Sequence, residues 1–315
     1  MILPSGYEQR PAGEADVDAV DGLLRAFDIA DFGEPDTPRD VVAEAFVSPF
    51  TENELDTRLI FAPDGTAAAF GGLQSITPAT SQDYFSRVHP DHRGRGLGSA
   101  LVDWGQSRAR QRLHAGERSR FLATTSSTDE AGHALMRAKG LRHVRSFWHM
   151  DRRVGSEDGP VAMPTGVTLR PFDPVTEWPT FHHLVESSFA EHWGFESVTL
   201  EQHKQLWTSF PAWRPELVVF AEVDGQPAGV VASSLTDFEG VGWIGELGVL
   251  REHRGRGIAQ ALLHRAFADF STLGLTRARL NVDAENTTGA TRLYERVGMT
   301  VRREWMVFEK VLVPD

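Results

Sequence analysis

The chain has 315 residues, of which 41% are hydrophobic and 10% aromatic, and this size and composition suit two domains that each bury a core. Its formal net charge of -12 argues against a general nucleic-acid-binding surface, because displacing counterions from phosphates needs clustered Lys and Arg. The absence of cysteine excludes disulfides, thiolate metal sites and a cysteine nucleophile.

The first residues carry no recognisable targeting signal. Met1–Arg10 has neither the positively charged start nor the apolar core that a secretory signal needs. No stretch of the sequence approaches the length and apolarity of a membrane span. We therefore expect a cytoplasmic protein with no membrane partner.

Four landmarks follow one another in the first half of the sequence. The apolar residues of Asp16–Phe27 recur at helical spacing. The apolar run Leu59–Ala62 leads into Asp64-Gly65, which predicts a hairpin, because glycine accepts the positive φ of a tight turn. A glycine-rich segment, Val88–Gly98, and a further segment, Leu122–Leu141, complete the series.

The same landmarks return in the second half, in the same order and offset by 158 to 162 residues. They are Trp178–Phe189, Val218–Ala221 followed by Asp224-Gly225, Val249–Ala259, and Leu280–Met299. Such nearly constant spacing indicates an internal duplication. Each copy alternates predicted strands and helices, which is typical of helices packed on a central sheet and places the fold in the α/β (α+β) class.

The joint between the copies lies in Arg152–Gly166, where five glycines and prolines stand among polar residues. We expect an N-terminal domain of residues 1–153, a linker of residues 154–166 and a C-terminal domain of residues 167–315.

The glycine-rich loop of the second copy predicts an anion site. It runs from Arg254 to Ala259, between a predicted strand, Trp243–Val249, and a predicted helix, Ile258–Phe270. Glycines let the backbone approach a ligand and point successive N–H groups the same way, and a helix N-terminus adds partial positive charge. Together these features can cradle a pyrophosphate. The alternative is a glycine-rich turn with solvated arginines. It is less favoured because both copies place the same loop between a predicted strand and a predicted helix.

Both loops resemble the acetyl-CoA loop of the GNAT superfamily of N-acyltransferases, with Arg93-x-x-Gly96-x-Gly98 in one copy and Arg254-x-x-Gly257-x-Ala259 in the other. A P-loop would need Gly-Lys-Ser/Thr, and a dinucleotide fingerprint would need Gly or Ala where Ser99 and Gln260 stand. The resemblance covers nearly the whole chain. It implies two tandem domains, each with a mixed, mostly antiparallel sheet flanked by helices, and acetyl-CoA as co-substrate without a metal.

The same resemblance implies residues that contact acetyl-CoA in each copy. In the second copy they are Leu247, Gly248, Val249, Arg254, Gly255, Arg256, Gly257, Ile258, Ala259, Gln260 and Asn286, and in the first Val88, Arg93, Gly94, Arg95, Gly96, Leu97, Gly98 and Ser99.

The candidate catalytic acid is Tyr294, which resemblance places near the thioester sulfur, as it places the Asn286 side chain on the CoA arm. When an amine attacks acetyl-CoA, the departing thiolate needs a proton, and a phenol of ordinary pKa about 10 can supply it. A backbone N–H near Val249 could stabilise the oxyanion. The first copy has Thr128 and Met136 at these positions, so we expect that copy to be non-catalytic and structural or regulatory.

The candidate base is Glu246, on the strand that leads into the loop, because the attacking amine must lose a proton to a carboxylate, often through water. Its counterpart in the first copy is Phe85. A solvated strand residue is an equally good interpretation of Glu246, and Glu304 is a weaker alternative base.

The candidate acceptor contacts are His192 and Trp193, within the aromatic segment Phe189–Phe195 that precedes Trp207 and Trp213. Aromatic rings suit a cationic amine, although they suit ordinary packing as well. His89 and His92 have no third ligand nearby, so we expect no metal site.

These features predict an acyl-CoA-dependent N-acetyltransferase that moves an acetyl group from acetyl-CoA to a primary amine of a small molecule by direct transfer, with catalysis in the second copy. The alternative is a non-catalytic acyl-CoA-binding sensor. We expect no nucleic-acid partner. The identity of the acceptor stays open between a cysteinyl pseudodisaccharide, an antibiotic amine and a polyamine. The oligomeric state stays open as well.

Overall fold

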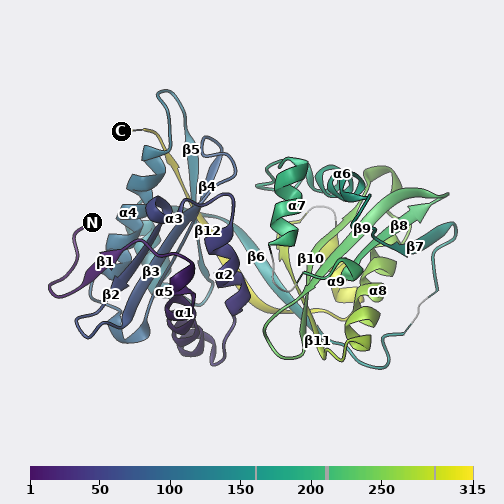
Figure 1. Ribbon diagram of the computed structural model, residues 1–315, viewed down its shortest axis with the longest axis horizontal. Helices are drawn as coiled ribbons and strands as arrows, with labels where there is room; N and C mark the ends of the chain where they lie inside the picture. The colour runs from purple at the N-terminus through teal and green to yellow at the C-terminus, as the bar shows by residue number, and fades with distance from the viewer. Residues whose placement is uncertain (160–161, 210–212, 287–288, 315) are drawn as a thin grey trace. The chain divides into compact units, whose positions relative to one another are not determined.

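A computed structural model describes residues 1–159, 162–209, 213–286 and 289–314 (Figure 1). The chain divides into an N-terminal unit, Met1–Arg145 with Trp305–Asp315, and a C-terminal unit, Ser146–Glu304.

The N-terminal unit holds five α-helices and most of six strands among its described residues. The helices are α1 (Val17–Phe32), α2 (Arg39–Val47), α3 (Asn53–Asp56), α4 (Leu97–Gln111) and α5 (Glu130–Ala138). The strands are β1 (Glu8–Arg10), β2 (Thr57–Phe61), β3 (Ala67–Gln74), β4 (Ser81–Val88), β5 (Ser119–Ser126) and β12 (Thr300–Leu312).

The C-terminal unit repeats this arrangement in the described part of its chain. Its α-helices are α6 (Trp178–Phe189), α7 (Leu200–Thr208), α8 (Ile258–Thr272) and α9 (Ala290–Arg296). Its strands are β6 (Arg142–Arg153), β7 (Val167–Pro171), β8 (Val218–Val223), β9 (Gln226–Leu235), β10 (Val241–Val249) and β11 (Arg277–Asp283).

Each unit contains a mixed, mostly antiparallel sheet, as the sequence predicts. The strand order is β1-β2-β3-β4-β5-β12 in the N-terminal unit and β7-β8-β9-β10-β11-β6 in the C-terminal unit. Within each order only the central pairs, β4 with β5 and β10 with β11, run parallel. Helices cover both faces: α6 and α7 pack on one side of the C-terminal sheet, and α8 and α9 pack on the other. The predicted fold class is therefore confirmed.

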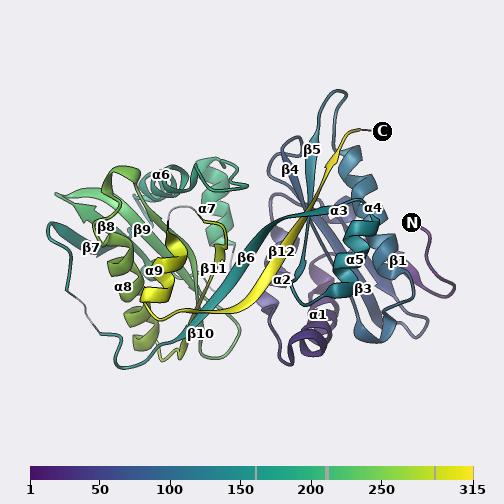
Figure 2. The ribbon, with the colours of Figure 1, turned by 180° about the vertical axis from the view of Figure 1, so that it is seen from behind.

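The last strands are exchanged between the two halves of the sequence. Strand β6, from the first half, pairs antiparallel with β11 in the C-terminal unit, whereas β12, from the second half, pairs with β5 in the N-terminal unit (Figures 1 and 2). The units therefore do not follow the single cut at residues 154–166. The described part of that segment connects β6 to β7 inside the C-terminal unit, and residues 160–161 lie outside the description.

The predicted helices and hairpins form for the reasons that the sequence suggests. The apolar side chains of α1 at Val17, Val20 and Leu23 are buried against the sheet, and the helix ends at Gly33, whose φ is 78°. The hairpin between β8 and β9 turns at Asp224 and Gly225, both with positive φ.

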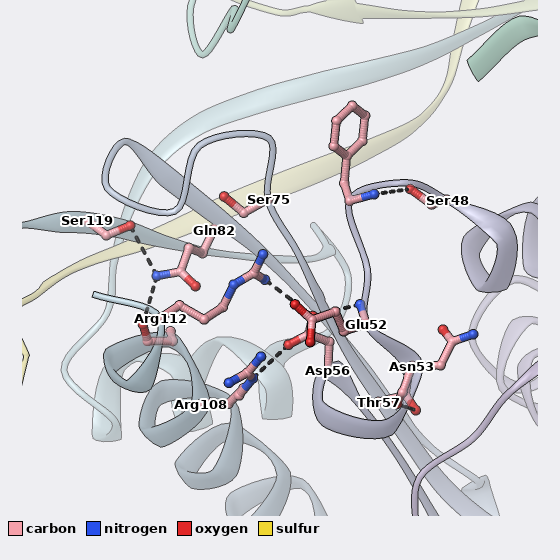
Figure 3. Close-up of polar contacts among 12 residues, drawn as sticks. Ser48, Glu52, Asn53, Asp56, Thr57, Ser75, Gln82, Arg108, Arg112 and Ser119 are labelled. Carbon is pink, nitrogen blue, oxygen red and sulfur yellow. Dashed lines mark hydrogen bonds and ion pairs between the residues drawn. The ribbon is translucent and has the colours of Figure 1, made fainter. Parts of the chain in front are cut away.

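A buried ion-pair cluster joins α3 to α4 in the N-terminal unit (Figure 3). The carboxylate of Asp56, fully buried, accepts a hydrogen bond from Arg108 Nε at 2.7 Å and lies 3.6 Å from Arg112 Nη1. It also accepts from the backbone N–H of Glu52. Because a lone buried charge is costly, this paired arrangement holds the start of β2 against the far end of α4.

No described helix is long and apolar enough to cross a membrane.

Glu44 on α2 gives the N-terminal unit a pH-dependent stability. Burial, and then the nearby Asp40, raise the pKa of Glu44 to about 7, so the native state favours the protonated carboxyl. The associated stability is present below about pH 4.5 and is lost as the pH rises through 7. We expect Glu44→Gln to stabilise the unit at pH 8 by on the order of 1–2 kcal/mol and to have little effect at pH 4.5. Thermal melts at both pH values test this, with the exposed Glu54→Gln as control; an equal effect at both would contradict it.

Candidate active site

A cavity of about 740 Å³ opens in the C-terminal unit, between β10, β11, α6 and the start of α8. The lining side chains and backbone come from four sets of residues. They are Phe147, Ser188, Phe189, His192, Trp193, Gly194 and Phe195; Ile244, Gly245, Leu247, Gly248 and Val249; His253, Arg254, Gly255, Gly257, Ile258, Ala259 and Gln260; and Leu280, Asn281, Val282, Asp283, Asn286, Gly289, Ala290, Leu293, Tyr294 and Arg296.

The cavity exists because β10 and β11 pair over only part of their length. Their parallel register runs from Val241 opposite Arg277 to Ile244 opposite Leu280. A bulge then interrupts β10 between Ile244 and Glu246. Beyond it, β10 pairs with β9 but, among the described residues, has no ladder partner on the β11 side. Unpaired backbone N–H and C=O groups on such an edge can bind an extended, amide-containing ligand.

The glycine-rich loop ends at the N-terminus of α8 beside this edge. Gly255 and Gly257 have φ of 76° and 79°, and a Cβ placed on Gly255 would meet no other atom within 4 Å. The first hydrogen bond of the helix runs from Ala261 N–H to Gly257 O, so the preceding N–H groups point out of the helix end. The start of this 15-residue helix therefore suits a pyrophosphate.

Arg254 anchors the loop to the protein. Its Nε donates to Val249 O at 3.1 Å, its Nη2 donates to Ser188 O at 3.2 Å, and its Nη1 lies 3.5 Å from a carboxylate oxygen of Glu191. Arg254 lines the cavity, whereas Arg256 does not. The geometry thus gives Arg254 a positioning role that the loop pattern alone could not reveal.

Tyr294 and Asn286 lie on the opposite wall. Tyr294 is buried on α9, and none of the hydrogen bonds found among the described residues engages its hydroxyl. Burial raises the pKa of Tyr294 to about 12, so the phenol stays protonated at neutral pH. Asn286 lines the same cavity, three residues before Gly289, where the described chain resumes. The structure thus brings the loop, Asn286 and Tyr294 to one cavity.

Glu246 lies beside the cavity and is not among its lining residues. It pairs across the sheet with Ala232, on the face covered by α6 and α7. One carboxylate oxygen is 3.8 Å from Nε2 of the buried His203, and this oxygen and both ring nitrogens have no hydrogen-bond partner among the described residues. The carboxylate therefore retains acceptor capacity, on the same strand as the cavity residue Gly248.

The part of the cavity predicted to hold the acceptor is aromatic. His192 and Trp193 both line it, and burial, with the nearby Arg254 charge, lowers the pKa of His192 below its ordinary value. Trp207 and Trp213 instead pack in the core around α6, with ring centroids 5.3 Å apart. Phe147 on β6 also lines the cavity, which the sequence analysis did not predict.

The loop of the N-terminal unit has the same backbone. Gly94 and Gly96 have φ of 72° and 87°, and Arg93 pairs with Asp31 at 2.8 Å as Arg254 pairs with Glu191. Arg95 donates to the Tyr7 hydroxyl at 3.0 Å. The remaining predicted contacts, Val88, Leu97, Gly98 and Ser99, belong to the end of β4 and the first turn of α4, where Val88 and Leu97 pack in the core.

Known proteins resemble this chain over most of its length. Residues 23–141 and 178–299 each match the acetyltransferase (GNAT) family. The chain belongs to the GNAT acetyltransferase family. It is an acyl-CoA-dependent N-acetyltransferase with two tandem GNAT domains.

Three relatives illustrate the similarity of this GNAT protein. The mycothiol acetyltransferase of Streptomyces griseus is 30% identical over 238 residues, 75% of this chain and 74% of that protein. The mycothiol acetyltransferase of Thermobispora bispora is 31% identical over 252 residues, 77% of this chain and 80% of that protein. A crystal structure of a GCN5-related N-acetyltransferase from Sphaerobacter thermophilus matches with a TM-score of 0.84 and 31% identity, covering 99% of this chain and 98% of that one.

The tandem arrangement of GNAT domains also occurs in a more distant structure. A tandem GNAT protein from the clavulanic acid biosynthesis pathway superposes with a TM-score of 0.75 at 19% identity, over 98% of this chain and 99% of that one. At this identity the likeness concerns the fold.

Proposed function

We propose that the C-terminal unit transfers the acetyl group of acetyl-CoA directly to a primary amine of a small molecule, and that the N-terminal unit is non-catalytic. The observation that carries the proposal is the convergence of three elements on one cavity: the glycine-rich loop, the open edge of β10 and Tyr294. Except for Arg256, the residues predicted to contact acetyl-CoA in the C-terminal unit line this cavity, which supports binding of the pyrophosphate and the amide-containing arm of CoA there.

In the proposed reaction the amine nitrogen attacks the thioester carbonyl, and the C–S bond breaks as the C–N bond is retained. Tyr294 donates its phenolic proton to the departing thiolate, and a backbone N–H near Val249 stabilises the oxyanion. Glu246 accepts the amine proton through water, which the partial exposure of its side chain, 22%, supports. The lowered pKa of His192 keeps that ring neutral, so it does not repel an ammonium group.

The N-terminal unit lacks the corresponding acid. Met136 is buried on α5 where α9 carries Tyr294, and a thioether has no proton to donate. Thr128 replaces Asn286, and its hydroxyl is 2.9 Å from that of Ser126. A structural role for this unit agrees with the strand that its half of the sequence contributes to the C-terminal sheet.

The mycothiol acetyltransferases among the relatives place cysteinyl sugars first among the amines to be tested. The panel also includes aminoglycosides, polyamines, amino acids and peptides, and CoA release from acetyl-CoA is the readout.

Two matched loop variants locate the reaction. Gly255→Glu and Gly94→Glu impose the same strain, because both glycines have positive φ and open space around a Cβ. We expect Gly255→Glu to raise the KM for acetyl-CoA by about 10-fold or more, because the carboxylate repels the pyrophosphate, and Gly94→Glu to change it by less than about twofold. Equal losses would contradict catalysis in the C-terminal unit. Stoichiometric acetyl-CoA binding without turnover of any amine would favour the sensor alternative.

A further inference from the structure

An aromatic pair lines one side of the cavity. The rings of Phe147 and Trp193 have centroids 6.0 Å apart, and both residues line the cavity. Trp193 follows α6, in the second half of the sequence. Phe147 lies on β6, opposite Asp283 of β11, and therefore reaches this cavity only through the exchange of the last strands.

The N-terminal unit contains an equivalent pair. Phe32 and Trp305 have ring centroids 5.8 Å apart. Trp305 stands 158 residues after Phe147, the offset that relates Leu122–Leu141 to Leu280–Met299, and Phe32 stands 161 residues before Trp193. Each pair thus joins one aromatic side chain from each half of the sequence.

The two units differ in what lies behind the aromatic pair. In the N-terminal unit it is Arg87, whose side chain is 7% exposed and whose Cζ lies 4.3 Å, 4.8 Å and 5.3 Å from the ring centroids of Phe85, Phe27 and Trp305. Its Nη1 donates to Ser86 O at 2.8 Å, and it forms no ion pair with a carboxylate in the described part of the chain. The aromatic faces hold this guanidinium by cation–π attraction.

In the C-terminal unit the residue 161 positions later is Gly248, which has no side chain. A Cβ there would approach Ser188 Cβ to 2.7 Å, so the position excludes any side chain. Gly248 therefore lines the cavity with its backbone alone, and no cationic side chain extends from this position.

We infer that Phe147 and Trp193 form the wall that selects the acceptor amine, so that the first half of the chain supplies a specificity-determining residue to the catalytic cavity. This inference rests on the proposed function. The acceptor class is a primary amine that enters as an ammonium group beside an apolar body, because the aromatic wall attracts the cation and covers the apolar surface. In the N-terminal unit Arg87 stands at the position equivalent to Gly248, and its guanidinium already lies over the ring of Trp305.

Binding and kinetics of Phe147→Ala test the inference, with Trp305→Ala as the matched variant of the other unit. The probes are phenethylamine, glucosamine and spermidine, measured by calorimetry in the presence of CoA and by acetyl transfer. We expect Phe147→Ala to raise the Kd and KM of the amine that the wild type binds best by about 10-fold, with the KM for acetyl-CoA within about twofold of wild type. Trp305→Ala should leave these amine constants unchanged. Phe147→Leu, which keeps most of the apolar volume, should fall between.

The outcomes separate this inference from the proposed function. Amine binding that weakens only in the Phe147 variants, without acetyl transfer by the wild type, would support the inference and contradict the proposed function. The inference would be overturned if Phe147→Ala kept the wild-type Kd and KM for the amine, or if Trp305→Ala had the same effect as Phe147→Ala. It would also be overturned if the wild type bound none of the probes.

Discussion

We expect Tyr294→Phe to lower kcat by roughly 10²- to 10³-fold while the KM for acetyl-CoA stays within about threefold of wild type. The substitution removes only the hydroxyl oxygen, and the ring keeps its place among Val297, Leu280 and the rest of the buried core. If Tyr294 protonates the departing thiolate, the loss falls on the chemical step and spares binding. Steady-state CoA release with the best amine of the panel measures both constants.

The raised pKa of Tyr294 also predicts how the wild-type kcat depends on pH. Burial stabilises the neutral phenol, so its pKa moves from 10.0 to about 12. The wild-type kcat should therefore show no decline from loss of this proton between pH 7 and 10. The same shift contributes stability that is complete below about pH 10 and is lost as the pH rises through 12. An alkaline decline of kcat near pH 9 that Tyr294→Phe abolishes would contradict this environment for the hydroxyl.

Met136→Leu is the control for this prediction. Met136 is buried on α5, 158 residues before Tyr294, and exchanging it for leucine nearly conserves volume. We expect wild-type kcat from this variant. A kcat of Tyr294→Phe within about threefold of wild type would remove the acid assignment and leave protonation of the thiolate to another group or to water.

The local elements and the loop could be predicted from the sequence because their determinants are local. Helical periodicity predicted α6 as Trp178–Phe189, as observed, and Asp224-Gly225 predicted the hairpin that joins β8 to β9. The duplication supplied the order of the elements, and the glycine spacing placed the loop between a strand and a helix. The helical periodicity, the turn dipeptide and the glycine spacing each extend over a few residues.

The exchange of the last strands could not be predicted in the same way. Alternating apolar residues in β6 favour a strand with one buried face. This pattern does not distinguish pairing with the sheet of the N-terminal unit from pairing with the sheet of the C-terminal unit. Which edge it joins depends on contacts with distant residues, such as Met150 with the core of the C-terminal unit. Phe147 was missed as a cavity residue for this reason. The aligned copies already contain Arg87 in one and Gly248 in the other. The structure was needed to show that Arg87 packs on aromatic rings and that Gly248 lines the cavity.

The exchange leads to a second prediction of large effect, which concerns fragments of the chain. A fragment of residues 154–315, cut where the sequence places the joint, lacks β6. Strand β11 then loses the ladder that runs from Arg277 to Asp283, and Arg277 and Arg279 lose the Asp151 carboxylate. The core loses Met150 and the packing of Trp148, each worth about 2–3 kcal/mol when fully buried. These losses approach the whole stability of an ordinary domain, about 5–15 kcal/mol.

The same fragment keeps β12 without its partner β5. The side chains of Phe308 and Leu312, buried in the N-terminal unit, would be exposed on an unpaired strand, which favours aggregation. A fragment of residues 146–304 instead keeps β6 with β11 and omits this strand. We expect residues 146–304 to melt cooperatively as a monomer and to bind acetyl-CoA, and residues 154–315 to aggregate or melt without a transition. Circular dichroism and size-exclusion chromatography compare them. A cooperative, monomeric 154–315 fragment with the Tm of the 146–304 fragment would show that β6 is dispensable for the fold of the C-terminal unit.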